Sequence, residues 1–501
     1  MAASDEDEEE EAALFIKPTI LNPETRVRLP TMNTFARSVQ RLSDRTGLTP
    51  GQLGIARVFD TPHHNPHATG PLQGMDVLVK DLHQVEGEVT TMGSVHQQFT
   101  APHYDSAAYA LLEAGARLVG MSTSAEFGTT AYTEPVGMDH PVNPISPLMM
   151  TGGSSGGAAV AVARGLVDVA HATDGGGSIR IPAACVGLPG LKPAHDRTVG
   201  HFTPAAQGFI AKDIATTARA YGVELSEDFG AGPAGAASNN PARPTHRLRI
   251  GYTNQPFHSI SRVDPAIAAA TAAASALAAT HPGVESVSQA PPPYPPAMFD
   301  LFSEMLAARC AYLPGELTPL TDWLRRRGQQ VPSWRRMRVE DQLLGLNPME
   351  AWSELDVILT PTLACAPPPP GTFSALPPAR NFQAQTAWTP WGTLWNITGW
   401  AAVSVPLVDP ARVPGRWPIS LMIGAVGSRV SAGELLSLAS FISDATSSLP
   451  AEGLSLELPG DVEALDYLRK PDNSHQYGHE HGDGHEHGDE HGHGEGAHGH
   501  G

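Results

Sequence analysis

The chain has 501 residues and a net charge of −20, from 52 acidic and 32 basic side chains. Fourteen of the acids lie in two terminal stretches, residues 5–11 and 471–501, and the net charge without them is −6. The chain therefore lacks the excess of basic residues that nucleic-acid binding requires. Three scattered cysteines favour a reducing cytoplasm over a disulfide framework, and we expect no membrane partner, because no run of about 18 apolar residues occurs.

Residues 1–15 predict an acidic, disordered arm, because seven consecutive acids repel one another. A solubilising role is the simpler interpretation, and docking to a basic partner is the alternative. Residues 31–46 have the apolar spacing of an amphipathic surface helix. His63, His64 and His67 then lie in a polar stretch that we interpret as a loop in preference to a metal site.

Predicted helices and strands alternate from residue 75 to residue 172, which is typical of an α/β fold. Lys80 stands out at the end of an apolar run, because the chain has only five lysines against 27 arginines. The predicted elements are strands at 75–80, 118–121 and 167–172 and helices at 106–114 and 158–166.

Two glycine–serine clusters, 152–157 (GGSSGG) and 175–178 (GGGS), flank the predicted helix at 158–166 and the predicted strand at 167–172. Ser178 precedes a predicted helix, whose free N–H groups favour negative charge, so the pair predicts a nucleophile and its oxyanion site. No lysine follows either cluster, as a phosphate-binding loop would require. A nucleophile elbow at Ser154 needs a preceding strand, which 143–147 does not supply. Structural turns alone would not explain two clusters in this order.

Elements continue to alternate in the second half of the chain. Residues 225–246, rich in Gly, Ala, Asn and Pro, predict a surface excursion or linker. We interpret four tryptophans as core or rim residues in preference to the lining of a substrate cleft: Trp388, Trp391, Trp395 and Trp400. The predicted elements are strands at 247–252, 355–359, 403–407 and 419–423 and helices at 265–279, 323–341 and 432–442.

The two clusters resemble the signature of the amidase signature family of serine hydrolases, which runs GGSSGGS, a spacer, and then G-T-D-x-G-G-S-I-R-x-P. The second half stands here as ATDGGGSIRIP at 172–182, and Ser154 and Ser178 have the family's separation of 24 residues. Ala158 and Ala194 depart from the pattern, but neither position is catalytic in the family. The resemblance covers most of residues 30–447 through further segments at 74–81, 90–94, 352–362 and 396–400.

The resemblance implies an α/β amidase signature fold with a large mixed central β-sheet covered by helices on both faces. It implies one amidase domain over residues 16–470, between the acidic arm and a tail at 471–501, although length alone would allow two or three domains.

The resemblance also implies a catalytic triad. Ser178 matches the nucleophile, Ser154 the bridging serine, which follows a cis peptide bond in the family, and Lys80 the general base. A lysine acts as a base only when it is neutral, which requires burial; the structural alternative is that Lys80 pairs with Asp81. Asp174 and Arg180 are interpreted as scaffolding. The implied oxyanion hole consists of backbone N–H groups from Gly175, Gly176, Gly177 and Ser178.

The implied activity is hydrolysis of a carbon–nitrogen amide bond in a small-molecule amide through an acyl-enzyme, without a cofactor. Segments 126–128 and 131–135 resemble those of bacterial 6-aminohexanoate cyclic dimer hydrolases, which favours secondary amides of modest size. One alternative is an ammonia-producing glutaminase similar to the A-type chain of amidotransferases, which would need partner subunits. An alternative of another class is a non-catalytic metal-binding protein. A homodimer stays open.

The tail at 471–501 carries nine of the 22 histidines, interleaved with Gly, Asp and Glu. It has almost nothing apolar to bury, so we expect it to be disordered. Imidazoles two residues apart can chelate a divalent metal. The candidate ligands are His479, His481, His485, His487, His491 and His493.

Overall fold

A computed structural model describes residues 33–198, 202–226, 247–259, 261–408 and 416–447 and the short strand at 455–456. The acidic arm and the histidine-rich tail lie outside these residues. So does nearly all of the predicted linker at 225–246.

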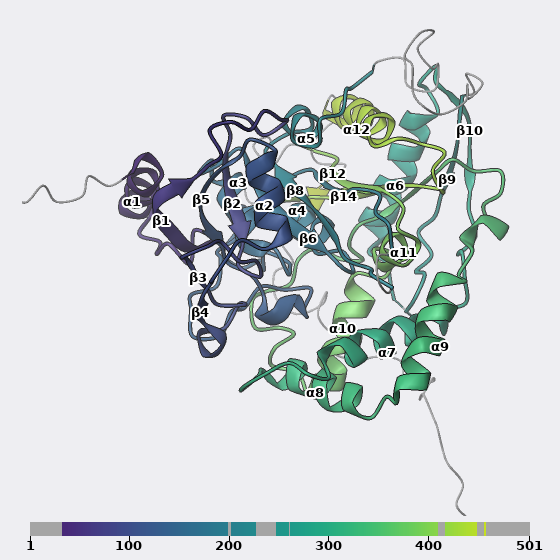
Figure 1. Ribbon diagram of the computed structural model, residues 1–501. Helices are drawn as coiled ribbons and strands as arrows, with labels where there is room; N and C mark the ends of the chain where they lie inside the picture. Colours follow the sequence, from purple (N-terminus) through teal and green to yellow (C-terminus); the bar gives the residue numbers. More distant parts are fainter. Residues whose placement is uncertain are drawn as a thin grey trace, which may run out of the picture.

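Within the described residues, eleven strands form one mixed sheet (Figure 1). Two runs of neighbouring strands are parallel, β5–β2–β6 and β11–β9–β10. Strand β1 pairs with β5 in the antiparallel sense, and the neighbouring strands from β6 across to β11 also pair in this sense. Across the sheet the order is β1 (Ile55–His63), β5 (Arg117–Ser122), β2 (Asp76–Lys80), β6 (Val169–Asp174), β8 (Ala206–Ala211), β7 (Gly190–Lys192), β12 (Ala402–Pro406), β14 (Ser420–Ala425), β11 (Val357–Pro361), β9 (Leu248–Tyr252) and β10 (Val284–Gln289).

Helices surround this sheet. Two smaller sheets have two strands each: β3 (Val89–Thr90) pairs with β4 (Phe99–Thr100), and β13 (Trp417–Pro418) pairs with β15 (Ser455–Leu456). The helices are α1 (Thr34–Thr46), α2 (Ser106–Glu113), α3 (Gly156–Ala163), α4 (Arg180–Val186), α5 (Ile214–Tyr221), α6 (Pro265–Ala278), α7 (Met298–Cys310), α8 (Pro319–Gln329), α9 (Ser333–Leu344), α10 (Pro378–Trp388), α11 (Thr393–Thr398) and α12 (Ala432–Ser447).

Strand β2 shows how the sheet is covered on both faces. Side chains alternate between the faces of a strand, and Val77 and Val79 belong to a buried cluster with residues of α2 and α5, whereas Leu78 belongs to a cluster with α1, α3 and α4. The predicted fold, a large mixed sheet with helices on both faces, is confirmed. Lys80 lies two residues beyond Leu78, so it projects toward the face that α3 and α4 cover.

Helix α1 illustrates how local sequence defines these elements. Asn33 caps the start, because its side-chain oxygen accepts a hydrogen bond from the N–H of Ala36 at 2.7 Å. The buried residues Phe35, Val39 and Leu42 follow at helical spacing. Gly47 ends the helix with a φ of 72°, a conformation that glycine adopts readily.

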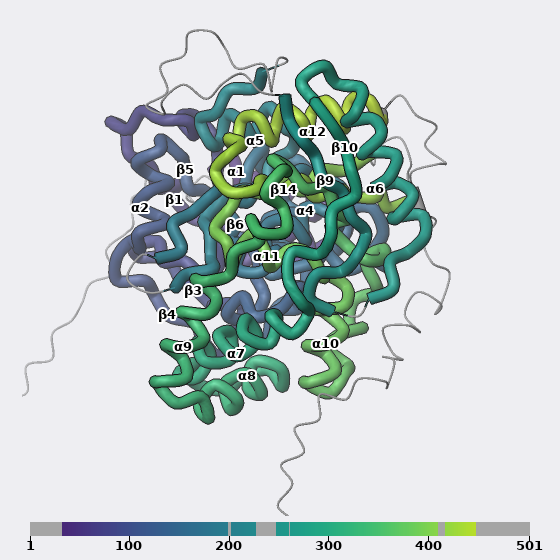
Figure 2. The backbone as a smooth tube through the Cα atoms, turned by 90° about the vertical axis from the view of Figure 1, so that its right-hand side faces the viewer, coloured from purple at the N-terminus to yellow at the C-terminus, as the bar shows by residue number. Residues whose placement is uncertain are grey.

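The prediction of one helix over residues 323–341 was wrong, because two helices occupy this region. Helix α8 ends at Gln329 and α9 begins at Ser333. Pro332 lies between them, and proline disfavours the helical conformation of the residue that precedes it. Helices α7, α8, α9 and α10 lie together below the sheet in the views of Figures 1 and 2.

Trp388, Trp391 and Trp395 are fully buried in the core, as the sequence analysis favours. Each indole N–H donates to a backbone carbonyl, of Cys365, Gln255 and Ala425 respectively. In the described part of the chain, no helix is both long and apolar enough to cross a membrane.

Candidate active site

Lys80 is the last residue of β2 and is fully buried. Its Nζ donates hydrogen bonds to Ser154 Oγ at 2.7 Å and to Thr173 Oγ1 at 2.9 Å. Burial lowers the pKa of Lys80 to about 7, although the Asp174 carboxylate acts in the opposite direction. A substantial fraction of this amine is therefore neutral near pH 7.

The alternative in which Lys80 pairs with Asp81 is wrong. The Asp81 carboxylate accepts hydrogen bonds from the backbone N–H and the hydroxyl of Thr91 instead. Burial raises the pKa of Asp81 to about 6, and the Thr91 hydrogen bonds oppose this effect. Lys80 is consequently directed toward the first glycine–serine cluster.

Ser154 lies in the loop before α3 and is buried. The peptide bond between Gly153 and Ser154 is cis, as the family resemblance predicts. A side chain at Gly153 would collide with the backbone of Tyr132, because a Cβ there would lie 2.5 Å from its carbonyl carbon. The glycine thus lets the loop pack closely enough to place Ser154 against Lys80.

Ser178 lies between β6 and α4 and is partly exposed in a cavity, together with Gly175 and Gly176. Gly128 lines the same cavity and also lies against Ser154, since a Cβ added to it would be 3.3 Å from Ser154 Oγ. Ser154 therefore lies behind the cavity wall, between the buried Lys80 and the space that contains Ser178.

The prediction of Gly177 as an oxyanion-hole donor is wrong. Its N–H already donates to Asp174 Oδ1 at 2.7 Å. Gly177 has a φ of 129°, and a side chain there would overlap Ile181, so its role is to shape the loop. Among the described residues, the N–H groups of Gly175, Gly176 and Ser178 have no protein partner.

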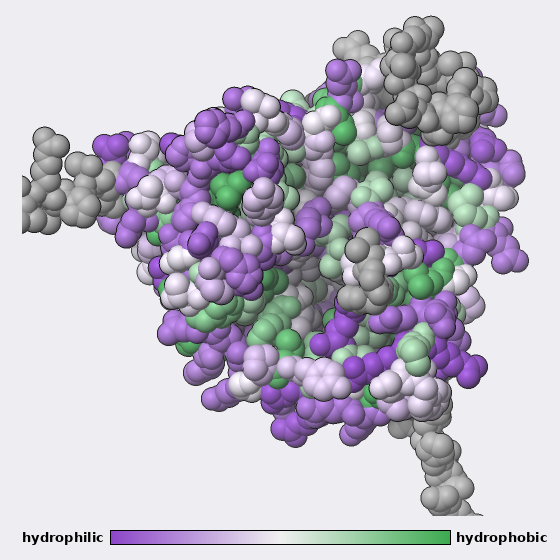
Figure 3. Space-filling view, in the orientation of Figure 1, coloured by the Kyte–Doolittle hydropathy of each residue, from purple (hydrophilic) through white to green (hydrophobic). Residues whose placement is uncertain are grey.

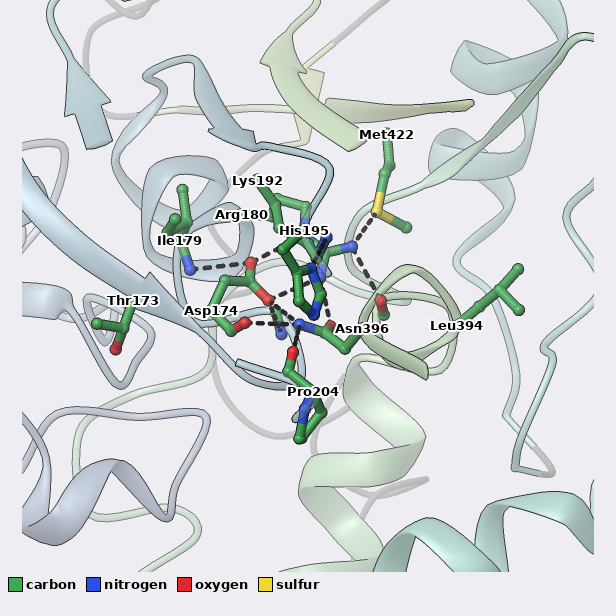
Figure 4. Close-up of polar contacts among 12 residues, drawn as sticks. Thr173, Asp174, Ile179, Arg180, Lys192, His195, Pro204, Leu394, Asn396 and Met422 are labelled. Atoms are coloured by element: carbon green, nitrogen blue, oxygen red, sulfur yellow. Dashed lines mark hydrogen bonds and ion pairs between the residues drawn. The ribbon is translucent and has the colours of Figure 1, made fainter. Parts of the chain in front are cut away.

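A buried ion pair holds this loop in place (Figure 4). Arg180 donates to both carboxylate oxygens of Asp174, at 2.8 and 2.9 Å. Asn396 donates to Asp174 and accepts from Arg180 at 2.8 Å. Burial alone would raise the pKa of Asp174, but the charge and hydrogen bonds of Arg180, together with the Asn396 hydrogen bond and the charge of Lys192, hold the pKa below its usual range.

The sequence analysis did not single out two residues that contact the residues of the candidate site, Thr173 and Asn396. Thr173 contacts Lys80 and Asn396 contacts Asp174, and both residues lie in segments that resemble the family. The signal was their place in those segments, since neither residue type marks a site by itself. Asp174 and Arg180, interpreted as scaffolding, contact each other directly.

The cavity has a volume of about 330 Å³ and is bounded by the second glycine loop, the segment at 127–131, and residues of α7 and α10. On the face shown in Figure 3, apolar residues (green) are exposed in a hollow near the centre, among hydrophilic ones (purple).

No group of three His, Cys, Asp or Glu residues in the described ranges is arranged to hold a metal ion. His63 contacts the Tyr104 hydroxyl and Glu88. The six candidate ligands of the tail lie outside the described residues, so metal binding there stays a prediction.

Comparison with known proteins places the chain among amidases. The Amidase family model matches residues 48–429. The putative amidase AmiB2 of Mycobacterium tuberculosis is 31% identical over 354 residues, which are 67% of this chain and 75% of that protein. The A-type chain of the glutamyl-tRNA(Gln) amidotransferase of Methanospirillum hungatei is 36% identical over 200 residues, or 38% of this chain, and the match spans only 46% of that protein.

Two solved structures share the fold. A 6-aminohexanoate cyclic dimer hydrolase complexed with substrate gives a TM-score of 0.64 at 23% identity, over 82% of this chain and 92% of that one. A bacterial aryl acylamidase of the amidase signature family gives 0.63 at 21% identity, over 84% and 93%. The match to the Amidase family over most of the described residues, together with this fold, shows that the chain belongs to the amidase signature family.

Proposed function

We propose that the chain hydrolyses a carbon–nitrogen amide bond of a small-molecule amide through an acyl-enzyme on Ser178. The main supporting observation is the buried contact between Lys80 Nζ and Ser154 Oγ, directly behind the cavity that Ser178 enters. Serine is a weak nucleophile unless a base removes its proton, and a buried lysine with a pKa near 7 provides that base.

In the proposed reaction, neutral Lys80 takes the Ser154 proton while Ser154 takes the proton of Ser178. The Ser178 oxygen bonds to the amide carbon, and the N–H groups of Gly175, Gly176 and Ser178 stabilise the oxyanion. The proton returns through Ser154 to the leaving nitrogen as the carbon–nitrogen bond breaks. Water then attacks the ester by the same route and releases the acid, so the reaction needs no cofactor.

Ser178 is expected to be the residue that a fluorophosphonate labels. Peptide mapping of the labelled protein should find the adduct on Ser178, and Ser178→Ala should abolish labelling. Ser38→Ala is the matched control, because Ser38 is also partly exposed but lies on α1, distant from the loop. An adduct on Ser154 would support the nucleophile-elbow alternative instead.

Turnover is expected to increase with pH through about 7, since only neutral Lys80 acts as a base and its pKa lies near that value. Below this pKa the amine is protonated and activity is lost. A profile of kcat against pH measures the effect. Thr173→Val should move the acidic limb to lower pH, because it removes a hydroxyl that accepts from the ammonium form. A flat profile across this range would contradict the assignment of Lys80 as the base.

Secondary amides of modest size are the proposed substrates, from the segments that resemble 6-aminohexanoate cyclic dimer hydrolases. A glutaminase related to the A-type chain of amidotransferases is the second candidate, because such chains are among the relatives. The cavity argues against it, since none of the described residues that line it is an Asp or Glu that could pair with the ammonium group of glutamine.

We also propose that the tail at 471–501 binds divalent metal at several weak sites, separately from catalysis. Deleting these residues is expected to abolish zinc or nickel binding in calorimetry and to leave kcat/KM within about threefold. Loss of activity on deletion, or no metal binding by the full chain at neutral pH, would contradict this separation. Metal binding without any labelling of Ser178 would favour the non-catalytic alternative. A homodimer and a cytoplasmic location stay predictions.

A further inference from the structure

Four ring-bearing side chains form one wall of the cavity. The His258 imidazole stacks on Phe299, with centroids 4.5 Å apart and planes inclined by 12°. Phe299 in turn stacks on Phe302 at 5.6 Å and on Phe382 at 6.2 Å, with interplanar angles of 28° and 26°. All four rings line the cavity. The nearly parallel planes and the short centroid distances show that the rings are stacked on one another, and we call this stack the aromatic wall.

The aromatic wall reaches the proposed oxyanion site. A Cβ added to Gly176 would lie 3.6 Å from Phe302 Cζ, and the N–H of Gly176 is one of the three without a protein partner among the described residues. A substrate carbonyl bound to that N–H therefore has the Phe302 ring beside it. Aromatic rings prefer offset-stacked or edge-to-face contacts with other rings over contacts with aliphatic groups of similar area.

Among the described residues, the lining of the cavity offers no negative charge to a cationic substrate. It contains no carboxylate, and its one arginine, Arg309, donates to the Phe202 carbonyl and contacts Met305. Burial lowers the pKa of His258 to about 3, so this ring is neutral near pH 7. An ammonium group placed here would lose its hydration without gaining a partner of opposite charge among these residues.

We propose that the substrate is an amide without a positively charged group that carries an aromatic ring close to the scissile carbonyl, with the ring against the aromatic wall. This inference rests on the proposed function, because it takes the N–H of Gly176 as part of the carbonyl-binding site. The contribution of the wall is a preference for flat aromatic groups over saturated groups of equal size.

Matched neutral amides test the preference. One pair is 3-phenylpropanamide and 3-cyclohexylpropanamide, with the ring on the acyl side, and the other is acetanilide and N-cyclohexylacetamide, with the ring on the amine side. In at least one pair we expect kcat/KM to be roughly two- to tenfold higher for the aromatic member. Glutamine should be a poorer substrate by about 100-fold or more, because its ammonium group finds no partner of opposite charge among the lining residues.

The same amides can be compared by how well each protects Ser178 from fluorophosphonate labelling, which measures binding without turnover. Phe302→Leu and Phe299→Leu should remove most of the aromatic preference, so that the ratio of kcat/KM between the aromatic and the saturated member of a pair falls toward one. Phe441→Leu is the matched control, since Phe441 also contacts a histidine, His281, but lies on α12 outside the cavity. Thermal unfolding checks that each variant is folded.

The outcomes separate this inference from the proposed function. If Ser178 is labelled but aromatic and saturated amides react and protect equally, the inference is wrong and the proposed function stands. Efficient glutamine hydrolysis, or a preference that survives both phenylalanine substitutions, also overturns the inference. If Ser178 is never labelled, the proposed function itself fails.

Discussion

Replacing Lys80 by alanine is expected to lower kcat by about 10²- to 10⁴-fold, the usual contribution of a general base. The reason is geometric as well as chemical, because Lys80 Nζ is the one lysine nitrogen within hydrogen-bond distance of Ser154 Oγ in the described structure. Steady-state kinetics on a neutral amide measures the change, and KM should change much less than kcat because Lys80 does not line the cavity.

Two further variants make this test specific. Lys212→Ala removes a lysine that is half exposed and pairs with Asp168 at the surface, and its kcat should equal that of the native chain. Lys80→Met retains most of the buried volume without the amine, so its kcat should be as low as that of Lys80→Ala. Turnover near the native level in Lys80→Met would show that another group acts as the base.

The residues proposed for the centre of the candidate site come from signals that are local in the sequence. Lys80 ends an apolar run and the two glycine–serine clusters flank one helix and one strand, so each of these signals lies within a short segment. The structure brings Lys80 and Ser154 into contact and places Ser178 in the adjacent cavity. The cis bond before Ser154 was predicted from the family resemblance alone.

The second glycine–serine cluster, at 175–178, shows a limit of this reasoning. Three consecutive glycines are equivalent as letters, but the Asp174 carboxylate takes the N–H of Gly177 and leaves those of Gly175 and Gly176 unpaired within the described residues. Which N–H group is engaged depends on the φ and ψ angles of the loop, and a local pattern does not encode them.

Contacts between distant segments were also beyond prediction. Asn396 is 222 residues from Asp174 along the chain, and its hydrogen bonds depend on the packing of α11 beside the glycine loop. The aromatic wall comes from α7, α10 and the segment before α6, and the sequence analysis predicts neither α7 nor α10. Tertiary packing, not periodicity, selects the residues that line the cavity.

Arg180→Ala is expected to lower the free energy of unfolding by about 3–5 kcal/mol, the usual cost of leaving one charge of a buried pair uncompensated. Asp174 and Arg180 are both almost completely buried. Without the guanidinium, the Asp174 carboxylate keeps only neutral hydrogen-bond donors among the described residues: the N–H groups of Gly177 and Ile179 and the amide of Asn396. Chemical denaturation at pH 7 measures the change.

Arg117→Ala is the matched control, because it also breaks an arginine–aspartate pair, with Asp76. That pair is at the surface, with the Arg117 side chain 47% exposed, so its loss should cost less than about 1 kcal/mol. Equal losses in the two variants would contradict the role assigned to the buried pair.

The pH dependence of this loss identifies its cause. In the native chain the pKa of Asp174 is lowered, so its contribution to stability is present above the unfolded-state pKa, about 3.9, and is lost as pH falls through the folded-state value. In Arg180→Ala, burial acts without the guanidinium, which is the main opposing cation, and the pKa of Asp174 rises. Protonation then removes the uncompensated charge, so the stability difference between native chain and variant should narrow as pH falls from 7 toward about 5. A purely steric defect would give the same difference at both pH values. Because Asp174 also accepts from the N–H of Gly177, the charge that stabilises the fold is the one that distinguishes Gly177 from Gly175 and Gly176, whose N–H groups have no protein partner among the described residues.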